Sequence, residues 1–248
     1  DVISAIRSCR KLGVRIERVK PKKYKIYGKG LGSLRAKKNT LLNFGNSGTL
    51  ARLLIGILTT TPDIEVKIQG DHSLNKRSMK ELIEQMNKFG SIFLPQNKFK
   101  FPLKLKSSLM PIGINYYSGV SAQLKSAVML AALNSYGDTK IFEQKKSRDH
   151  TENLLKENKQ TIKIKDGREK IITIRGKKYL NPINVNVPGD ISSSAFFAAL
   201  TLLNQNSKIQ IKNVGLNPTR TGFYKLLKKK NAKIKFLNVK KFNNELRG

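Results

Sequence analysis

The sequence predicts an α/β fold built from three copies of one unit. Ser47, Ser121 and Ser192 each precede an apolar helix with few charges, and the three serines are nearly equally spaced along the chain. Alternating strands are expected between these helices, and the regular spacing of similar elements indicates an internal repeat. Because a helix that is apolar on nearly all faces has to be buried, we expect all three to lie inside, covered by sheets. The apolar stretches comprise residues 50–58, 124–133 and 195–203.

In chain order, amphipathic helices and strands alternate, with small residues between them. Residues 2–12 carry apolar side chains at helical spacing, and Gly13 follows as a typical helix C-cap. Residues 14–19 alternate between apolar and polar, which predicts a half-buried strand, and residues 24–27 predict a second one. The other predicted elements are a charged helix at 79–89 and strands at 64–68, 92–94, 102–105, 112–116, 139–142, 161–164, 171–174 and 183–187.

The composition is that of a soluble globular protein. The chain has 248 residues, of which 39% are hydrophobic, and its one cysteine cannot form an internal disulfide. The longest apolar runs are far shorter than the roughly 18 to 20 residues of a membrane span, so we expect a cytoplasmic protein with no membrane partner. Cys9, His72 and His150 are scattered without metal-ligand spacing, so no metal site is expected.

A formal net charge of +33 would ordinarily place nucleic acid first among the partners. Here the lysines are spread over nearly every segment, as a compositional drift along the whole chain would produce. Basic residues interleaved with aromatic ones, which would stack on bases, are confined to residues 98–101. We therefore expect no nucleic acid partner, and a general positive field that attracts small anionic substrates.

The stretch from Gly45 to Thr49 joins the end of an apolar strand to an apolar helix. Gly45 and Gly48 flank Asn46 and Ser47 and allow positive φ, which would bring backbone N–H groups close to a ligand. The following helix would add the positive end of its dipole, so the stretch is suited to hold an anion. An ordinary helix capped by Ser47 is the alternative. We expect the apolar helices to start on a common side, so that several N-termini surround one ligand.

A second candidate site begins at Ser121. Its hydroxyl can cap the following helix, and Gln123 can both donate and accept a hydrogen bond at the mouth of that helix. Capping alone explains Ser121, but it does not explain Gln123 and Lys125 so near the start of an otherwise apolar helix. This combination favours a binding function.

Residues 147–152 place a hydroxyl, a guanidinium, a carboxylate and an imidazole within one short stretch. A capping box formed by Asp149 or Ser147 with Glu152 is the structural alternative. The two interpretations are compatible, because the entrance of a helix is also a place where an anion binds.

Arg77 is a further candidate for anion binding. It lies in the polar stretch 70–79, just ahead of the charged helix. The planar fork of an arginine at this place suits a carboxylate, and a solvated surface arginine is the alternative.

Taken together, these motifs resemble the enolpyruvyl transferase family, and within it the branch of 5-enolpyruvylshikimate-3-phosphate synthases. They follow the family's order along the whole chain, which is a far more specific signal than one glycine-rich loop. The motifs are residues 45–49 with Arg52, 70–79, 121–127, 147–152, 188–193 and 215–220. Residues 147–152 also favour the shikimate branch over the sister enzymes that act on a UDP-sugar, whose loop cysteine has no counterpart here, because Cys9 lies in the first helix.

The resemblance implies a fold of two similar domains, each made of three βαβαββ units, with buried helices under mixed sheets and the active site between the domains. Residues 1–187 are expected to be the first domain without its N-terminal part. Residues 188–248 are expected to be the beginning of a truncated second domain. The sequence is therefore expected to be a fragment that lacks both ends of the protein, and the protein is expected to be a monomer.

The resemblance also implies which residues bind the substrates. Ser121, Ala122 and Gln123 are expected to hold shikimate 3-phosphate, with Ser147 on its phosphate and Arg148 against the same substrate. Gly48 and Arg77 are expected to contact phosphoenolpyruvate, and Gln123 to contact both substrates. The resemblance implies no metal ion and no other cofactor.

The implied reaction is attack of the shikimate 5-hydroxyl on C2 of a protonated enolpyruvate, followed by loss of phosphate from a tetrahedral intermediate. The herbicide glyphosate is the family's known occupant of the phosphoenolpyruvate site. The family's lysine and serine near the N-terminus and its acidic, lysine, glutamate and arginine groups of the second domain have no counterparts in this sequence. We therefore name no catalytic residue and expect the 248 residues alone to be inactive. A basic nucleic-acid-binding protein and a UDP-sugar enolpyruvyl transferase are the alternatives.

Overall fold

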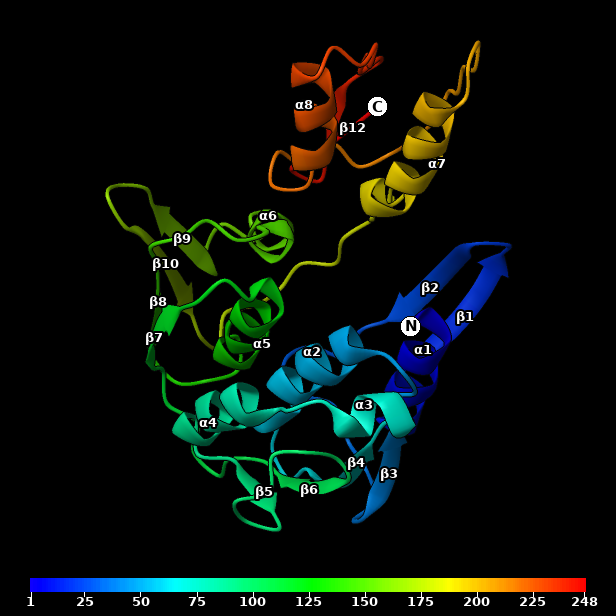
Figure 1. The fold of residues 1–248 in the computed structure, drawn as a ribbon. Coiled ribbons are helices and arrows are strands. Elements are labelled where there is room, and N and C mark those ends of the chain that lie inside the picture. The colour runs from blue at the N-terminus through cyan, green and yellow to red at the C-terminus, as the bar shows by residue number, and fades with distance from the viewer. The chain divides into compact units, whose positions relative to one another are not determined.

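The computed structural model describes residues 1–248, and the chain forms two compact units (Figure 1). Unit 1 comprises Asp1–Lys145 and Asn158–Pro182, and unit 2 comprises Lys146–Glu157 and Ile183–Gly248. The helices of unit 1 are α1 (Val2–Lys11), α2 (Gly48–Thr59), α3 (His72–Lys76), α4 (Lys80–Lys88) and α5 (Ala122–Ala132). Its strands are β1 (Arg15–Lys20), β2 (Lys23–Tyr27), β3 (Thr40–Asn43), β4 (Glu65–Gln69), β5 (Ile92–Leu94), β6 (Leu103–Lys106), β7 (Asn115–Ser118), β8 (Asp138–Glu143), β9 (Ile162–Lys165) and β10 (Lys170–Arg175). Unit 2 contains α6 (His150–Leu155), α7 (Ile191–Leu203), α8 (Gly222–Lys229), β11 (Lys240–Phe242) and β12 (Glu245–Arg247).

Two four-stranded sheets in unit 1 have the same topology, which confirms the predicted repeat. Their strand orders are β3-β4-β6-β5 and β7-β8-β10-β9. In each sheet the first two strands are parallel, and the remaining neighbours are antiparallel. The parallel connection passes through an apolar helix in both cases, α2 in the first sheet and α5 in the second. Along the chain, each copy therefore reads βαβαββ.

Unit 2 contains a reduced third copy of the same pattern. Gly189 pairs in parallel with Val214 on the other side of α7, and Gly215 pairs antiparallel with Arg247 of β12. The strand predicted at 183–187 is absent, and the first strand of this copy is reduced to the single bridge at Gly189. The antiparallel β11 and β12 complete the pattern.

The core of unit 1 is formed where α2 and α5 pack against each other (Figure 1). A Cβ on Gly56 of α2 would lie 2.4 Å from the backbone oxygen of Ala127 of α5, so the two helices approach as closely as a glycine allows. Leu54, Ile55 and Leu58 of α2 are buried. The buried residues of α5 include Ala127, Val128, Met129 and Ala131. The prediction that these two apolar helices lie inside is confirmed.

The same prediction is wrong for α7. Only Ile191 and Ser194 of this helix are buried, whereas Phe196 is 79% exposed and Leu203 is 84% exposed. The reason is that the core of unit 2 is small. Ile191 packs there with Val214 and Tyr224, and this cluster contacts one side of the helix.

Lys125 is part of a buried ion pair within unit 1. Its Nζ lies 2.7 Å from Oε1 of Glu143 in β8, and both side chains are fully buried. Lys170 Nζ lies 3.4 Å from the other carboxylate oxygen. Lys125 therefore ties α5 to its sheet, and the interpretation of Lys125 as part of a binding site is wrong. No helix of the chain has the length and apolar character needed to cross a bilayer.

Candidate functional site

Two capped helix N-termini lie next to each other in unit 1. The Leu50 N–H donates to Ser47 Oγ at the start of α2 (3.1 Å), and the Leu124 N–H donates to Ser121 Oγ at the start of α5 (3.3 Å). Both serines are thus N-caps, as the capping alternatives predicted. Gln123 Nε2 donates to Thr49 Oγ1 across the two first turns (2.8 Å). The positive ends of two helix dipoles are therefore adjacent, and the expected common start is confirmed for α2 and α5.

Two arginines converge on the first turn of α2. Arg52 Nη1 donates to Gly48 O (2.9 Å) and to Gln123 Oε1 (3.2 Å), while Arg77 Nη2 donates to Asn46 Oδ1 (3.0 Å). All three acceptors are uncharged, so these hydrogen bonds do not neutralise the charge of either guanidinium. Together with the helix ends, the pair makes a concentration of positive charge and N–H donors. Such a place is suited to an anion.

Burial and the neighbouring charge of Arg77 lower the pKa of the half-buried Arg52 guanidinium, against the opposing effect of the Glu81 carboxylate. The pKa direction shows that the cationic form of Arg52 is held at some electrostatic cost. An anion bound beside the two arginines would offset that cost, because a nearby opposite charge favours the cationic form.

Gly48 contributes space to this site. A Cβ at Gly48 would lie 2.9 Å from Arg52 Nη1 and 3.2 Å from Arg77 Nη1. The expectation that both glycines of the loop adopt positive φ is confirmed for Gly45, whose φ is +57°, and is wrong for Gly48, which is the first residue of α2. Gly48 is needed because a side chain there would displace the two guanidinium groups.

The structure brings five of the seven expected site residues to one part of unit 1. Gly48 begins α2, the Arg77 side chain reaches the loop before it from the end of α3, and Ser121, Ala122 and Gln123 stand at the start of α5 beside it. The sequence interpretation gave no role to Arg52, although Arg52 is what connects Gly48 with Gln123. Its spacing of one helical turn from Gly48 was the available signal.

Ser147 and Arg148 belong to unit 2, where they precede α6. Ser147 is partly buried and Arg148 is exposed. The capping box alternative is wrong for Asp149, which is the N-cap of α6 and whose side chain makes no capping hydrogen bond. The Asp149 carboxylate instead accepts from Asn217 Nδ2 (2.7 Å).

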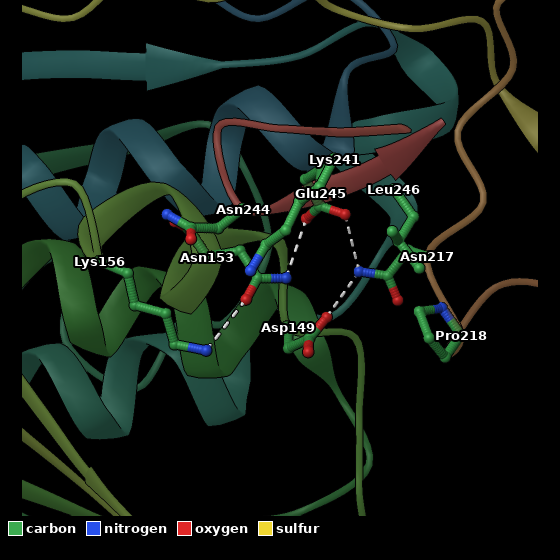
Figure 2. A pocket seen from close by; sticks show the side chains of 9 residues that line it. All are labelled: Asp149, Asn153, Lys156, Asn217, Pro218, Lys241, Asn244, Glu245 and Leu246. Atoms are coloured by element: carbon green, nitrogen blue, oxygen red, sulfur yellow. Dashed lines mark hydrogen bonds between the residues drawn. The ribbon is translucent and has the colours of Figure 1, made fainter. Parts of the chain in front are cut away.

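A polar cavity of about 330 Å³ lies within unit 2 (Figure 2). Its polar groups already bind one another: Asn217 Nδ2 also donates to Glu245 Oε2 (2.9 Å), and Asn153 Nδ2 donates to Glu245 Oε1 (3.1 Å). These bonds join α6 to β12 and to the Asn217 loop, so we interpret the cluster as structural. The cavity is lined by Asp149, Asn153, Lys156, Asn217, Pro218, Lys241, Asn244, Glu245 and Leu246.

No group of three or more His, Cys, Asp or Glu side chains is placed to hold a metal ion. The candidate site is the cluster at the N-termini of α2 and α5, which consists of helix ends, guanidinium groups and one amide.

Comparison with known proteins gives consistent matches. Residues 1–246 match the family model of EPSP synthase (3-phosphoshikimate 1-carboxyvinyltransferase). The chain is 42% identical over 236 residues to a 3-phosphoshikimate 1-carboxyvinyltransferase of Bacillus subtilis, covering 94% of this chain and 54% of the relative. It is 39% identical over 248 residues to one of Petrotoga mobilis, covering 99% and 56%. The solved structure of EPSP synthase from Acinetobacter baumannii superposes with a TM-score of 0.85 at 32% identity, over 99% of this chain and 54% of that one. The chain thus spans about half the length of the relatives that it matches.

Proposed function

Because the chain belongs to the EPSP synthase family, we propose that the complete protein transfers the enolpyruvyl group of phosphoenolpyruvate to the 5-hydroxyl of shikimate 3-phosphate and releases phosphate. The observation that carries this proposal is the convergence of Arg52, Arg77 and Gln123 on the adjacent N-termini of α2 and α5. A small substrate with several negative charges fits such a place, and a neutral one does not.

Phosphoenolpyruvate would bind over the first turn of α2. Gly48 would contact it through the backbone, Arg77 would hold one of its anionic groups, and Gln123 would contact it from α5. Each charge-assisted hydrogen bond contributes about 1.5 to 3 kcal/mol, so several of them account for firm capture of a small anion. The missing Cβ of Gly48 supports this assignment, because it leaves the two guanidinium groups in place.

Shikimate 3-phosphate would bind at the start of α5 through Ser121, Ala122 and Gln123. The Ser121 oxygen accepts a hydrogen bond as the helix cap, and its O–H remains able to donate to a ligand. As the resemblance implies, Ser147 would bind the phosphate and Arg148 would lie against the same substrate. Gln123, which would contact both substrates, would set their distance from each other.

In the proposed reaction, the 5-hydroxyl oxygen bonds to C2 of phosphoenolpyruvate while C3 gains a proton and the hydroxyl loses one. The tetrahedral intermediate then breaks its C2–O bond to phosphate, and loss of a proton from C3 restores the double bond. The residues of the cluster bind and orient the two anions. We assign no proton transfer to any of them.

Phosphate release from phosphoenolpyruvate by the purified complete protein tests this function. We expect release with shikimate 3-phosphate as the acceptor, and background release with a UDP-sugar or without an acceptor. Release with the UDP-sugar but not with shikimate 3-phosphate would assign the protein to the sister enzymes. Release with no acceptor would refute a transferase.

We also propose that the protein is a cytoplasmic monomer without a nucleic acid partner. The even spread of its lysines supports this, although its net charge of +33 favours nucleic acid binding as the second candidate function. Electrophoretic shift of DNA and RNA at rising salt, beside calorimetry with shikimate 3-phosphate, separates the two. Nucleic acid binding through phosphates fades steeply with salt, so a shift that persists at physiological ionic strength would favour the second candidate.

A further inference from the structure

The amide of Gln123 is held on both sides by residues of α2. Its Oε1 accepts from Arg52 Nη1 (3.2 Å), and its Nε2 donates to Thr49 Oγ1 (2.8 Å). The same Arg52 nitrogen donates to Gly48 O (2.9 Å), so the guanidinium is itself fixed to the first turn of α2. The residue that connects the two helix ends therefore also contacts the functional group of Gln123.

The two contacts differ in whether they fix the orientation of the Gln123 amide. A hydroxyl such as that of Thr49 can donate or accept, so it tolerates either orientation of an amide. A guanidinium has donors only, so it can face the oxygen of an amide and not its nitrogen. Arg52 is thus the group that decides which way the Gln123 amide points. With Oε1 facing Arg52, the Nε2 group has one N–H for Thr49 and a second one for a ligand.

We propose that Arg52 is a positioning residue for the transfer reaction, which acts through Gln123 by presenting the amide N–H, rather than the amide oxygen, to an anionic substrate. This inference rests on the proposed function. An amide turned the other way would place its oxygen next to a negatively charged group, so the wrong orientation would oppose binding. Arg52 would therefore matter for binding and orientation of the substrates without contacting them.

The position of Arg52 supports a specific role. It is half-buried beside Arg77, and both burial and the charge of Arg77 disfavour the cationic form of its guanidinium. A simple link between two helices needs no charge, whereas fixing the orientation of an amide requires a group that cannot accept a hydrogen bond. Arginine meets this requirement at every pH of interest.

A double-mutant cycle in the complete protein tests the proposal. Arg52→Met keeps the stem and removes the donors, and Gln123→Met removes the amide. We expect each single variant to raise KM for phosphoenolpyruvate by about 10-fold or more, which is the scale of one charged hydrogen bond, and the double variant to be no worse than Gln123→Met. Effects that multiply in the double variant would show that Arg52 acts on the substrate directly and would overturn the proposal. Arg175→Met, at an exposed arginine of β10, controls for loss of a positive charge.

Thermal unfolding separates positioning from a merely structural link. If Arg52 only joins the helices, Arg52→Met lowers Tm and leaves KM unchanged in the folded enzyme. That result would overturn the proposal. If Arg52→Met does not fold, Arg52→Lys retains a group with donors only and is expected to keep KM within a few-fold of wild type. A KM for Arg52→Lys as poor as that of Gln123→Met would also count against the proposal.

A spectroscopic measurement tests the inference independently of activity. In protein labelled with ¹⁵N-glutamine, the Gln123 side-chain amide is identified by its absence in Gln123→Met. We expect Arg52→Met to shift or broaden this signal and Arg175→Met to leave it unchanged. An unchanged signal in Arg52→Met would refute the orientation by Arg52. If the complete protein shows no transfer reaction, the proposed function fails, and this measurement still decides whether Arg52 orients the amide.

Discussion

At the scale of single residues, the site depends on where a side chain is missing. Gly48 begins α2, and the atoms nearest to its absent Cβ are nitrogens of Arg52 and Arg77. These are the ends of flexible side chains, so a methyl group would be accommodated by moving the charges and not by distorting the backbone. The effect of a substitution should therefore appear in anion binding more than in stability.

Gly48→Ala in the complete protein is expected to weaken phosphoenolpyruvate binding and to weaken glyphosate binding further, because the longer inhibitor needs more of the same space. Overpacking typically costs about 1 to 3 kcal/mol, or roughly 5- to 150-fold in affinity. Inhibition curves and KM for phosphoenolpyruvate measure both effects, and Tm should change little. Equal inhibition of wild type and variant by glyphosate would show that the missing Cβ of Gly48 provides no space for the ligand.

The sequence predicted the main members of the site, because each lies in a short motif at a helix start. Gly48, Arg77 and Gln123 could be selected in this way and do come together in unit 1. The contact of Arg52 with Gln123 could not be predicted, since the two residues are distant in sequence, whereas its spacing of one helical turn from Gly48 could be seen. Lys125 was misinterpreted for the same reason: a lysine early in a helix can face a ligand or, as here, a buried carboxylate of a neighbouring strand.

At the scale of helices and strands, the crossing of α2 and α5 fixes the distance between the two N-termini. Gly56 and Ala127 touch at this crossing, and the contacting atom is a backbone oxygen that cannot move away independently. In an isolated helix, replacing glycine by alanine is favourable by up to about 1 kcal/mol. At Gly56 the overpacking of about 1 to 3 kcal/mol should outweigh that gain.

Gly56→Ala is therefore expected to lower the free energy of unfolding and Tm, measured by denaturant and thermal unfolding. Gly222→Ala is the matched control, because Gly222 begins α8 and a Cβ there would meet no atom within 4 Å. We expect the control to be neutral or slightly stabilising. A stabilised Gly56→Ala would mean that the two helices are not in contact at this residue.

The N-terminus of α7 predicts a dependence of stability on acid pH. Burial alone would raise the pKa of the Asp190 carboxyl, but hydrogen bonds from Ser193 and Ser192 and the charge of Arg220 outweigh it and lower the pKa below the ordinary 3.8. A carboxyl with a lower pKa in the folded state contributes stability above that ordinary value, and the contribution is lost as pH falls through the folded pKa. The effect should be modest, because Asp190 is exposed.

Thermal unfolding from about pH 6 down to about pH 2.5 measures this contribution. We expect Asp190→Asn to be less stable than wild type at the upper end of the range and to approach it at the lower end. A constant difference over the whole range would show that the ionised carboxylate contributes nothing, and that the cap acts through its neutral hydrogen bonds.

Local patterns predicted most elements because helical spacing and alternation depend on neighbours in sequence. Thus α4 and β8 lie within one residue of the expected bounds. Two of the errors concern packing between distant segments. Residues 183–187 alternate as a strand does but have no strand partner, and α7 has the composition of a buried helix but packs on one side only. No pattern within either segment could reveal what lies beside it.

At the scale of the whole molecule, the chain supplies anion-binding groups in unit 1 and spans about half the length of its curated relatives. We assign no proton transfer to the cluster at α2 and α5, and the proposed reaction requires proton transfer both when the intermediate forms and when it breaks down. The 248-residue chain alone is therefore expected to show no turnover. Phosphate release above background from shikimate 3-phosphate and phosphoenolpyruvate by this chain would contradict the expectation, with the complete protein as the positive control.

The most direct test of the account is the dissociation constant of the complete protein for phosphoenolpyruvate, measured by calorimetry with shikimate 3-phosphate present. Arg77→Lys keeps the charge and loses the fork, so we expect binding weaker by about 1 to 3 kcal/mol, or roughly 5- to 150-fold. Arg175→Lys makes the same change at an exposed arginine of unit 1 and should bind as wild type does. If Arg77→Lys also bound phosphoenolpyruvate with the wild-type constant, Arg77 would be a surface residue, and the cluster at the N-termini of α2 and α5 would not be the phosphoenolpyruvate site.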